Sequence, residues 1–216
     1  MIIIETQAVG PFFKNGFVVW CDRTREAVLI DPGDEVAGLL EYADRKALAI
    51  RYILLTHAHV DHVTGVGAAK GTLGVPVYLH RDDLFLYERA VEMGAMFGLR
   101  VDPPPAVDEF YTPGQVISFG DCEARPLHTP GHCPGGVCLA VRSADPPVIE
   151  HLFVGDTLFA GSIGRTDLPG GDHATLIASI RTVLFSFGDD ARVHPGHGPS
   201  TTIGEERRTN PFLVPA

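Results

Sequence analysis

Four potential metal ligands lie within six residues, directly after a short apolar run. The run at residues 53–55 predicts a buried β-strand, and Thr-His-Ala-His-Val-Asp-His follows it at once. Alternate side chains of an extended segment point to the same side, so we expect His57 and His59 to project together. Asp61 and His62 should turn towards a neighbouring point as the chain bends into a helix. Imidazole and carboxylate groups suit zinc, and also iron or manganese, so this segment predicts a metal site.

Three later ligand-type residues also follow apolar runs or lie between them, and each has glycine beside it. His132 lies in Pro-Gly-His-Cys-Pro-Gly-Gly, Asp156 in Gly-Asp-Thr, and His197 in Pro-Gly-His-Gly-Pro. Glycine lets a backbone approach a ligand closely or adopt a positive φ. Four such sites along one chain indicate a centre assembled where strands end. The five remaining histidines are expected to be ordinary polar residues at strand or loop ends: His80, His128, His151, His173 and His194.

Short β-branched and aromatic runs alternate with glycine, proline and helical spacing along the chain. The runs predict strands at 1–9, 16–21, 27–30, 53–55, 75–79, 116–119, 123–127, 136–141, 148–154 and 192–194. Apolar residues at helical spacing predict helices at 35–48, from 62 or 63 to 74, at 82–99 and at 174–187. Because strands and helices do not alternate strictly, we expect an α+β fold of two mixed sheets covered by helices. A chain of 216 residues, 45% of them hydrophobic, favours a single domain over 1–216.

Charge and cysteine usage limit the partners and the compartment. The 17 basic residues face 27 acidic ones, and the net charge of -10 with no basic run argues against a nucleic-acid or anionic membrane surface. No apolar stretch approaches the roughly 20 residues that span a bilayer. The first residues lack a basic leader, and the four cysteines form no C-x-x-C pair. We therefore expect a cytoplasmic monomer or homodimer that acts on a small molecule, without nucleic-acid or membrane partners.

The H-x-H-x-D-H segment together with the distant His132, Asp156 and His197 resembles the signature of the metallo-β-lactamase superfamily. The resemblance extends from the Asp-Pro-Gly turn at 31–33 to Asn-Pro-Phe at 210–212. It implies a four-layer αβ/βα sandwich with a pair of divalent metal ions at one edge. Zinc is the metal we expect first, with iron or manganese as alternatives. By the same resemblance, one ion would bind His57, His59, His132 and Asp156, and the second would bind Asp61, His62, His197 and the shared Asp156.

Within this superfamily, the chain is most similar to the short bacterial form of glyoxalase II-type thioester hydrolases. Three segments are shared: Gly-Asp-Thr-Leu-Phe at 155–159, Gly-Arg-Thr-Asp at 164–167 and Pro-Gly-His-Gly-Pro at 195–199. The resemblance implies hydrolysis of a thioester such as S-lactoylglutathione by a metal-bound hydroxide, which Asp61 would orient besides binding metal. Arg165 matches a basic residue that contacts the carboxylate of the thiol, although a salt bridge within its loop explains it equally well.

The chain departs from its relatives at a few positions. Lactam hydrolases usually have cysteine in place of Asp156, and the flavodiiron branch has glutamate in place of His59. Two tyrosines of the glyoxalase II family are replaced here by Asp167 and Pro199.

Two other activities remain as alternatives. The related persulfide dioxygenases use one iron, held by residues that match His57, His132 and Asp156. They follow the last histidine with Asp-Tyr, however, where this chain has Gly-Pro. Metal-dependent nucleases share the H-x-H-x-D-H core, but the acidic net charge of -10 argues against a nucleic-acid substrate.

Overall fold

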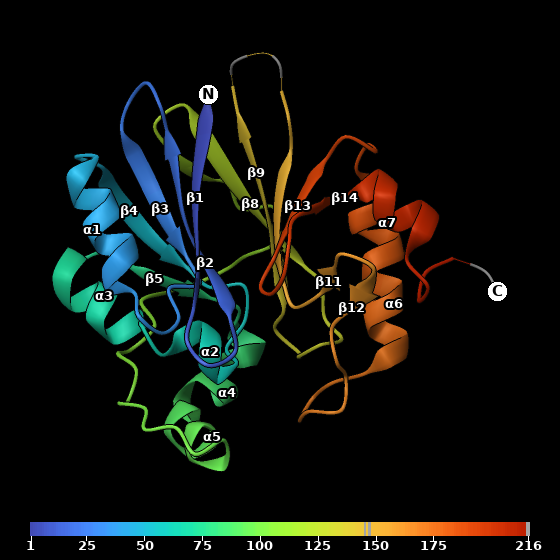
Figure 1. Cartoon of the computed structure of the whole chain (residues 1–216), viewed down its shortest axis with the longest axis horizontal. Helices are drawn as coiled ribbons and strands as arrows, with labels where there is room; N and C mark the ends of the chain where they lie inside the picture. Colours follow the sequence, from blue (N-terminus) through green and yellow to red (C-terminus); the bar gives the residue numbers. More distant parts are fainter. Residues whose placement is uncertain (145, 147, 215–216) are drawn as a thin grey trace.

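The computed structural model describes residues 1–144, 146 and 148–214 and consists of two six-stranded sheets packed face to face (Figure 1). The first sheet has the order β1-β2-β3-β4-β5-β6, with parallel pairs from β3 to β6. Its strands are β1 Ile2–Val9, β2 Lys14–Cys21, β3 Glu26–Ile30, β4 Ala49–Leu54, β5 Val77–Leu79 and β6 Glu109–Phe110.

The second sheet has the order β14-β13-β10-β9-β8-β7, and only β10 and β13 pair in parallel. Its strands are β7 Ile117–Phe119, β8 Cys122–His128, β9 Val137–Ser143, β10 His151–Gly155, β13 Arg192–Pro195 and β14 Thr201–Thr202. A separate two-stranded ribbon consists of β11 Leu158–Phe159 and β12 Ser162–Ile163. Both large sheets mix parallel and antiparallel pairs, as predicted.

Helices cover the outer faces of both sheets. The first sheet carries α1 Ala37–Arg45 and α3 Val66–Leu73, and the second carries α6 His173–Thr182 and α7 Ile203–Thr209 (Figure 1). The remaining helices are α2 Val60–Val63, the 3₁₀ turn η1 Arg81–Asp83, α4 Leu84–Glu88, α5 Ala90–Met96 and the 3₁₀ turn η2 Leu184–Ser186. Helix, sheet, sheet and helix form the four layers of the predicted sandwich. No helix in the described part of the chain has the length and apolar character needed to cross a membrane.

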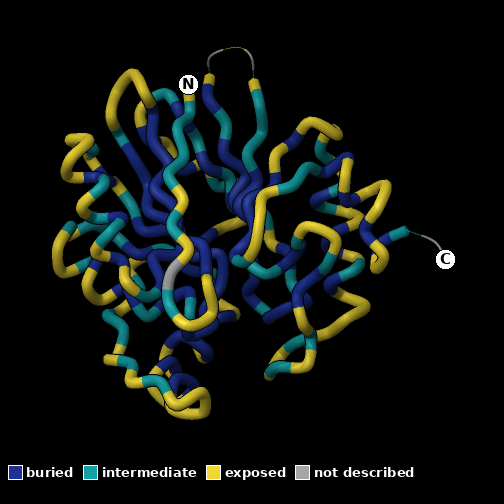
Figure 2. The backbone as a smooth tube through the Cα atoms, viewed as in Figure 1, coloured by how far each residue is buried: buried dark blue, intermediate teal, exposed yellow. Residues whose placement is uncertain are grey.

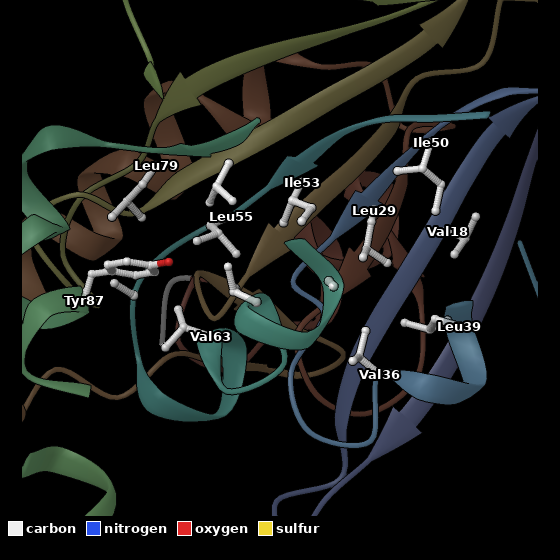
Figure 3. Packing of buried hydrophobic residues seen from close by; sticks show 14 of the residues in the cluster. Val18, Leu29, Val36, Leu39, Ile50, Ile53, Leu55, Val63, Leu79 and Tyr87 are labelled. Carbon is white, nitrogen blue, oxygen red and sulfur yellow. The ribbon is translucent and has the colours of Figure 1, made fainter. Parts of the chain in front are cut away.

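The hydrophobic core has three layers, one in each space between adjacent layers of secondary structure. Alternate residues of β2 enter different layers, because neighbouring side chains of a strand point to opposite faces: Val18 packs with the helices, and Phe17 packs between the sheets. Leu29 and Ile53 lie in the same outer layer as Val18 (Figure 3). Buried backbone fills the centre of the molecule, and exposed segments lie mainly on outer helices and loops (Figure 2).

Several predicted elements are wrong in their bounds. The continuous helix predicted at 82–99 is replaced by η1, α4 and α5, and Arg89 (φ -97°, ψ 13°) separates α4 from α5. The helix predicted from 62 or 63 divides into α2 and α3. The strand predicted at 148–154 begins only at His151. Helix α7 and four strands of two residues each (β6, β11, β12 and β14) were not predicted. Two residues are too few to show any period, so these strands leave no pattern in the sequence.

Strand direction places the predicted ligands at one edge of the sandwich. The parallel strands β3 and β4 end at Ile30 and Leu54, so the segments that follow both of them emerge side by side. In the second sheet, β10 and β13 are also parallel, and Asp156 and His197 follow their ends. The β8–β9 loop, with His132, opens at the same edge because β8 runs in the same direction as β10.

Candidate metal centre

The segment after β4 brings four polar side chains to one place. His57 and His59 follow β4, the backbone of His59 is extended, and the ring centroids of the two residues are 4.8 Å apart. Helix α2 begins directly after His59 and carries Asp61 and His62 on its first turn. The ring of His62 lies 4.0 Å from that of His57. The change from extended to helical backbone therefore gathers all four side chains, as the spacing predicted.

The first group of candidate ligands, which we call the imidazole group, consists of His57, His59 and His132. One nitrogen of each lies within 4.8 Å of the others, and Nδ1 of His59 is 2.8 Å from Nε2 of His132. All three side chains are buried. Burial, reinforced by the neighbouring imidazoles, lowers the pKa of His57 well below its usual value and lowers the pKa of His59 to about 3. Both rings are therefore neutral at physiological pH and have lone pairs available for a metal ion.

The second group, which we call the carboxylate group, consists of Asp61, His62 and His197. Nε2 of His197 lies 3.1 Å from Oδ2 of Asp61, and Nε2 of His62 lies 3.8 Å from the same oxygen. Burial works to lower the pKa of both histidines, but the surrounding carboxylates outweigh it. They raise the pKa of His62 to about 9 and that of His197 to about 10. Without metal, His62 and His197 therefore hold protons that His57 and His59 lack.

Asp156 lies between the two groups. Its Oδ1 is 3.4 Å from Nε2 of His62, and its Oδ2 is 3.5 Å from Nε2 of His197 and 3.7 Å from Nε2 of His132. Glycine at position 196 is required for this approach, because a Cβ atom there would lie only 2.3 Å from Oδ1 of Asp156. One carboxylate thus contacts both groups.

The second ring nitrogen of four histidines is held by a hydrogen bond. Nδ1 of His132 donates to the backbone oxygen of Arg165 (2.8 Å), and Nδ1 of His197 donates to that of Phe12 (3.0 Å). Nδ1 of His62 contacts Oδ2 of Asp31 (2.9 Å), and Nδ1 of His57 contacts Oγ1 of Thr56 (3.1 Å). These bonds orient each ring and direct its Nε2 to the centre, as the outer partners of metal-binding histidines do.

Unpaired buried atoms at the centre fit a metal site. Nε2 of His57, Nε2 of His62 and Oδ1 of Asp156 are buried and have no hydrogen-bond partner. Leaving such an atom unpaired costs about 1–3 kcal/mol, so their convergence requires a compensating interaction. Imidazole nitrogens and carboxylate oxygens are ligands for zinc, iron and manganese. The seven predicted side chains therefore form two adjoining donor sets that fit two divalent cations.

Asp31 and Lys14 support this centre, and sequence reasoning missed both. We interpreted Asp31 only as part of a turn, but its buried carboxylate accepts hydrogen bonds from N and Oγ1 of Thr56 (2.7 and 2.6 Å) besides holding His62. The Nζ of Lys14 donates to the backbone oxygen of Asp31. Burial lowers the pKa of Lys14 to about 8, against the attraction of Asp31 and Asp61. A lone lysine at the start of a strand carries no signal of such a position.

Asp83 was also missed, because we placed it within a long helix. Its carboxylate is fully buried and accepts hydrogen bonds from the backbone N–H of Ala58 (3.0 Å) and of Gly135 (2.6 Å). The thiol of Cys133 donates to it as well (3.2 Å). Asp83 therefore ties the residue between His57 and His59 to the loop that carries His132, and so holds the imidazole group together.

Arg165 lies at the mouth of the centre, where it lines a cavity of about 160 Å³ together with candidate ligands of both groups. Two of its nitrogens bind the two carboxylate oxygens of Asp167 at 2.7 Å each. The salt bridge that the sequence offered as an alternative role for Arg165 is therefore present. Its guanidinium is nevertheless close enough to the cavity to meet a substrate there.

Four of the five other histidines form two pairs away from the centre, and His173 begins α6. The rings of His80 and His128 stack at 4.3 Å with only 6° between their planes, and Asp82 lies beside them. Ring lone pairs lie in the ring plane, so two parallel stacked rings cannot aim them at one ion. His151 and His194 are joined by a hydrogen bond of 3.1 Å. Their geometry favours the ordinary polar roles that we expected.

Known proteins share this fold and much of this sequence. Residues 9–197 match the model of the metallo-β-lactamase superfamily. The chain is 38% identical to the hydroxyacylglutathione hydrolase GloC of Haemophilus influenzae, over 97% of both chains. It is 43% identical to TTHA1623, solved in a di-iron-bound form (TM-score 0.85, 97% of this chain and 100% of that one). It is 37% identical to the BLEG-1 B3 metallo-β-lactamase (TM-score 0.89, 99% and 100%). The chain belongs to the metallo-β-lactamase superfamily.

Proposed function

We propose that the protein is a binuclear metal-dependent hydrolase that cleaves thioesters, with S-lactoylglutathione as the reference substrate. The observation that carries this proposal is the placement of Asp156 between two complete donor sets. The description of the relative from Haemophilus influenzae as a hydroxyacylglutathione hydrolase supports the thioester. The relative with two bound irons supports a pair of ions, so iron stands beside zinc as a candidate metal.

The imidazole group and Asp156 would hold one ion, and the carboxylate group with the same Asp156 would hold the other. When bound, such ions would lower the pKa of a coordinated water from 15.7 to about 7 and polarise a carbonyl group. Asp61 lies at the cavity, hydrogen-bonded to His197, and its carboxylate would accept a hydrogen bond from the attacking water and orient it. Arg165 is the one guanidinium among the residues that line the cavity, and we assign it the substrate contact.

Metal analysis combined with a single variant tests the proposal. Purified protein should contain two equivalents of zinc or iron and hydrolyse S-lactoylglutathione. His59→Ala should lose at least about a hundredfold in kcat/KM, since it removes a group from the imidazole set. His128→Ala is the matched control, because His128 lies in the stacked pair outside the centre.

Three results would contradict the proposal. Full activity of His59→Ala would reject the ligand assignment. One bound iron with oxygen uptake on glutathione persulfide would replace hydrolysis by dioxygenation. Faster cleavage of a β-lactam than of any thioester would assign the chain to lactam chemistry, which we include because BLEG-1 is described as a B3 metallo-β-lactamase.

A further inference from the structure

The cavity over the centre has one apolar wall. Phe12, from the loop between β1 and β2, meets Phe97, just after α5, edge to face with ring centroids 5.7 Å apart. Met93 of α5 and Leu168 also line the cavity. Phe12 is 37% exposed and Phe97 is 46% exposed, so apolar surface faces solvent directly beside the predicted ligands. A ligand that covers this surface gains binding free energy from burying it.

Hydrogen bonds connect the Phe12 part of the wall to the centre. The backbone oxygen of Phe12 accepts the hydrogen bond from Nδ1 of His197 (3.0 Å). Three residues later, the backbone N–H of Asn15 donates to the backbone oxygen of Gly196 (2.7 Å), and its side-chain amide donates to the backbone oxygen of Pro195 (3.0 Å). The loop that supplies Phe12 is thus tied to the segment that supplies His197, so a group packed on Phe12 has a defined distance from the reacting atoms.

The one side-chain cation at the mouth is already paired with a carboxylate. Among the residues that line the cavity, Arg165 is the one lysine or arginine, whereas Asp61 and Asp156 are assigned to the metal ions and their charge is neutralised there. Asp167 already binds the guanidinium of Arg165 through both of its oxygens. A thiol with carboxylates, such as glutathione, must therefore compete with Asp167 for the one cation while it approaches a chain of net charge -10.

We propose that this cavity selects neutral thioesters with a short apolar acyl chain, and that Phe12 and Phe97 determine this specificity. The inference rests on the proposed hydrolase function and names its substrate class. Water adds to the carbonyl carbon and the C–S bond breaks. The products are a carboxylate, a thiol without charged groups, and one proton. The cavity volume of about 160 Å³ lies below the roughly 300 Å³ at which pockets for drug-sized ligands begin, which favours a short acyl chain over a fatty acid.

A matched series of substrates tests the selectivity. The metal-loaded protein is assayed with the acetyl, butanoyl and hexanoyl thioesters of N-acetylcysteamine, a thiol without carboxylates, and with S-butanoylglutathione. From acetyl to butanoyl, kcat/KM should rise about tenfold, as expected for burying two methylene groups. The butanoyl thioester of N-acetylcysteamine should exceed S-butanoylglutathione by about fivefold or more. A preference for the glutathione thioester would overturn the proposal.

Four variants connect the selectivity to the residues. Phe12→Ser and Phe97→Ser should each flatten the dependence on chain length, whereas Phe13→Ser should preserve it. Phe13 is the matched control because it neighbours Phe12 but is 74% exposed and does not line the cavity. Asp167→Asn should release Arg165 and raise kcat/KM for S-butanoylglutathione about fivefold, with no gain for the neutral thioester. Equal effects of Phe12→Ser and Phe13→Ser would remove the apolar wall from the argument.

A binding measurement separates this inference from the hydrolase proposal. The thioether S-hexyl-N-acetylcysteamine cannot be hydrolysed, and calorimetry should show that it binds the wild type more tightly than S-hexylglutathione does. If no thioester is cleaved but this order of binding holds, the hydrolase function fails and the selectivity of the cavity stands. If thioesters are cleaved but the order is reversed, the hydrolase function stands and the inference fails.

Discussion

The imidazole group and the carboxylate group start from the same six-residue segment but end in different electrostatic states. His57 and His59 combine with His132 in a buried site where burial holds the pKa of both His57 and His59 low. His62, three residues after His59, has a pKa raised to about 9, because Asp61, Asp31 and Asp156 surround it. Residues of one type in one motif thus take opposite protonation states.

This difference has a consequence for metal binding. Histidine must be neutral to bind a metal, so an ion entering the carboxylate group has to displace protons from His62 and His197, whereas an ion entering the imidazole group meets His57 and His59 already neutral. The carboxylate group is also nearer to solvent, with the side chain of His197 27% exposed. We therefore expect the two groups to differ in metal affinity and in its dependence on pH, with Asp156 coupling them.

Asp156→Asn should have the largest effect, because Asp156 contacts both groups. We expect loss of both metal equivalents and a fall in kcat of about a thousandfold, at the upper end of what a single site residue contributes. Metal analysis by mass spectrometry and steady-state kinetics measure these. If one equivalent is retained at full occupancy, the two groups are independent and Asp156 does not couple them.

Asp83→Ala should damage the imidazole group selectively. The change leaves the buried N–H groups of Ala58 and Gly135 without an acceptor, at about 1–3 kcal/mol each, so we expect about 4 kcal/mol less free energy of unfolding. Urea denaturation measures this, and metal titration should show that the imidazole group weakens more than the carboxylate group.

The control for this prediction is Asp82→Ala, the neighbouring residue with an exposed side chain. Its free energy of unfolding should stay within about 0.5 kcal/mol of the wild type, as for most surface changes. Equal losses in both variants would remove Asp83 from the support of the imidazole group.

Lys14→Met should change how the free energy of unfolding depends on pH, because it removes a buried titratable amine near the carboxylate group. Burial lowers the pKa of Lys14 from 10.5 in the unfolded chain to about 8, so between these values the unfolded chain binds more protons than the folded one. The wild type should therefore gain roughly 3 kcal/mol in free energy of unfolding relative to the variant between about pH 7 and about pH 10.5. Denaturation at a series of pH values measures the difference, and a constant difference would show that Lys14 does not titrate there.

His128→Ala should have the smallest effect, since His128 belongs to neither group. We expect an unchanged metal content and less than about 1 kcal/mol change in the free energy of unfolding, as for most partly exposed residues. If this variant loses a metal equivalent, the stacked pair of His80 and His128 is a third ligand site, and the comparison of two groups is incomplete.

The sequence predicted more of the centre than of its supports. Ligand-type residues after apolar runs are visible because strand ends are marked by period and by glycine, and His132, Asp156 and His197 were found in this way. Asp83 was hidden because it lies in a segment with helical spacing, which predicted one long helix. In the structure the segment divides into η1, α4 and α5, and Asp83, the last residue of η1, accepts buried hydrogen bonds from Ala58 and Gly135. These partners are distant in the sequence, so no local pattern predicts them.

The amino-acid order alone determined the two mixed sheets, the helical covers and the identity of the seven candidate ligands, because periodicity and residue type are local properties. Only the tertiary structure decided which of His57, His59 and His62 are protonated, that Asp83 supports the imidazole group, and that Asp167 pairs with the guanidinium of Arg165. The reason is physical: the pKa of a side chain depends on burial and on charges within a few ångströms, and most of those charges come from residues far away in the chain.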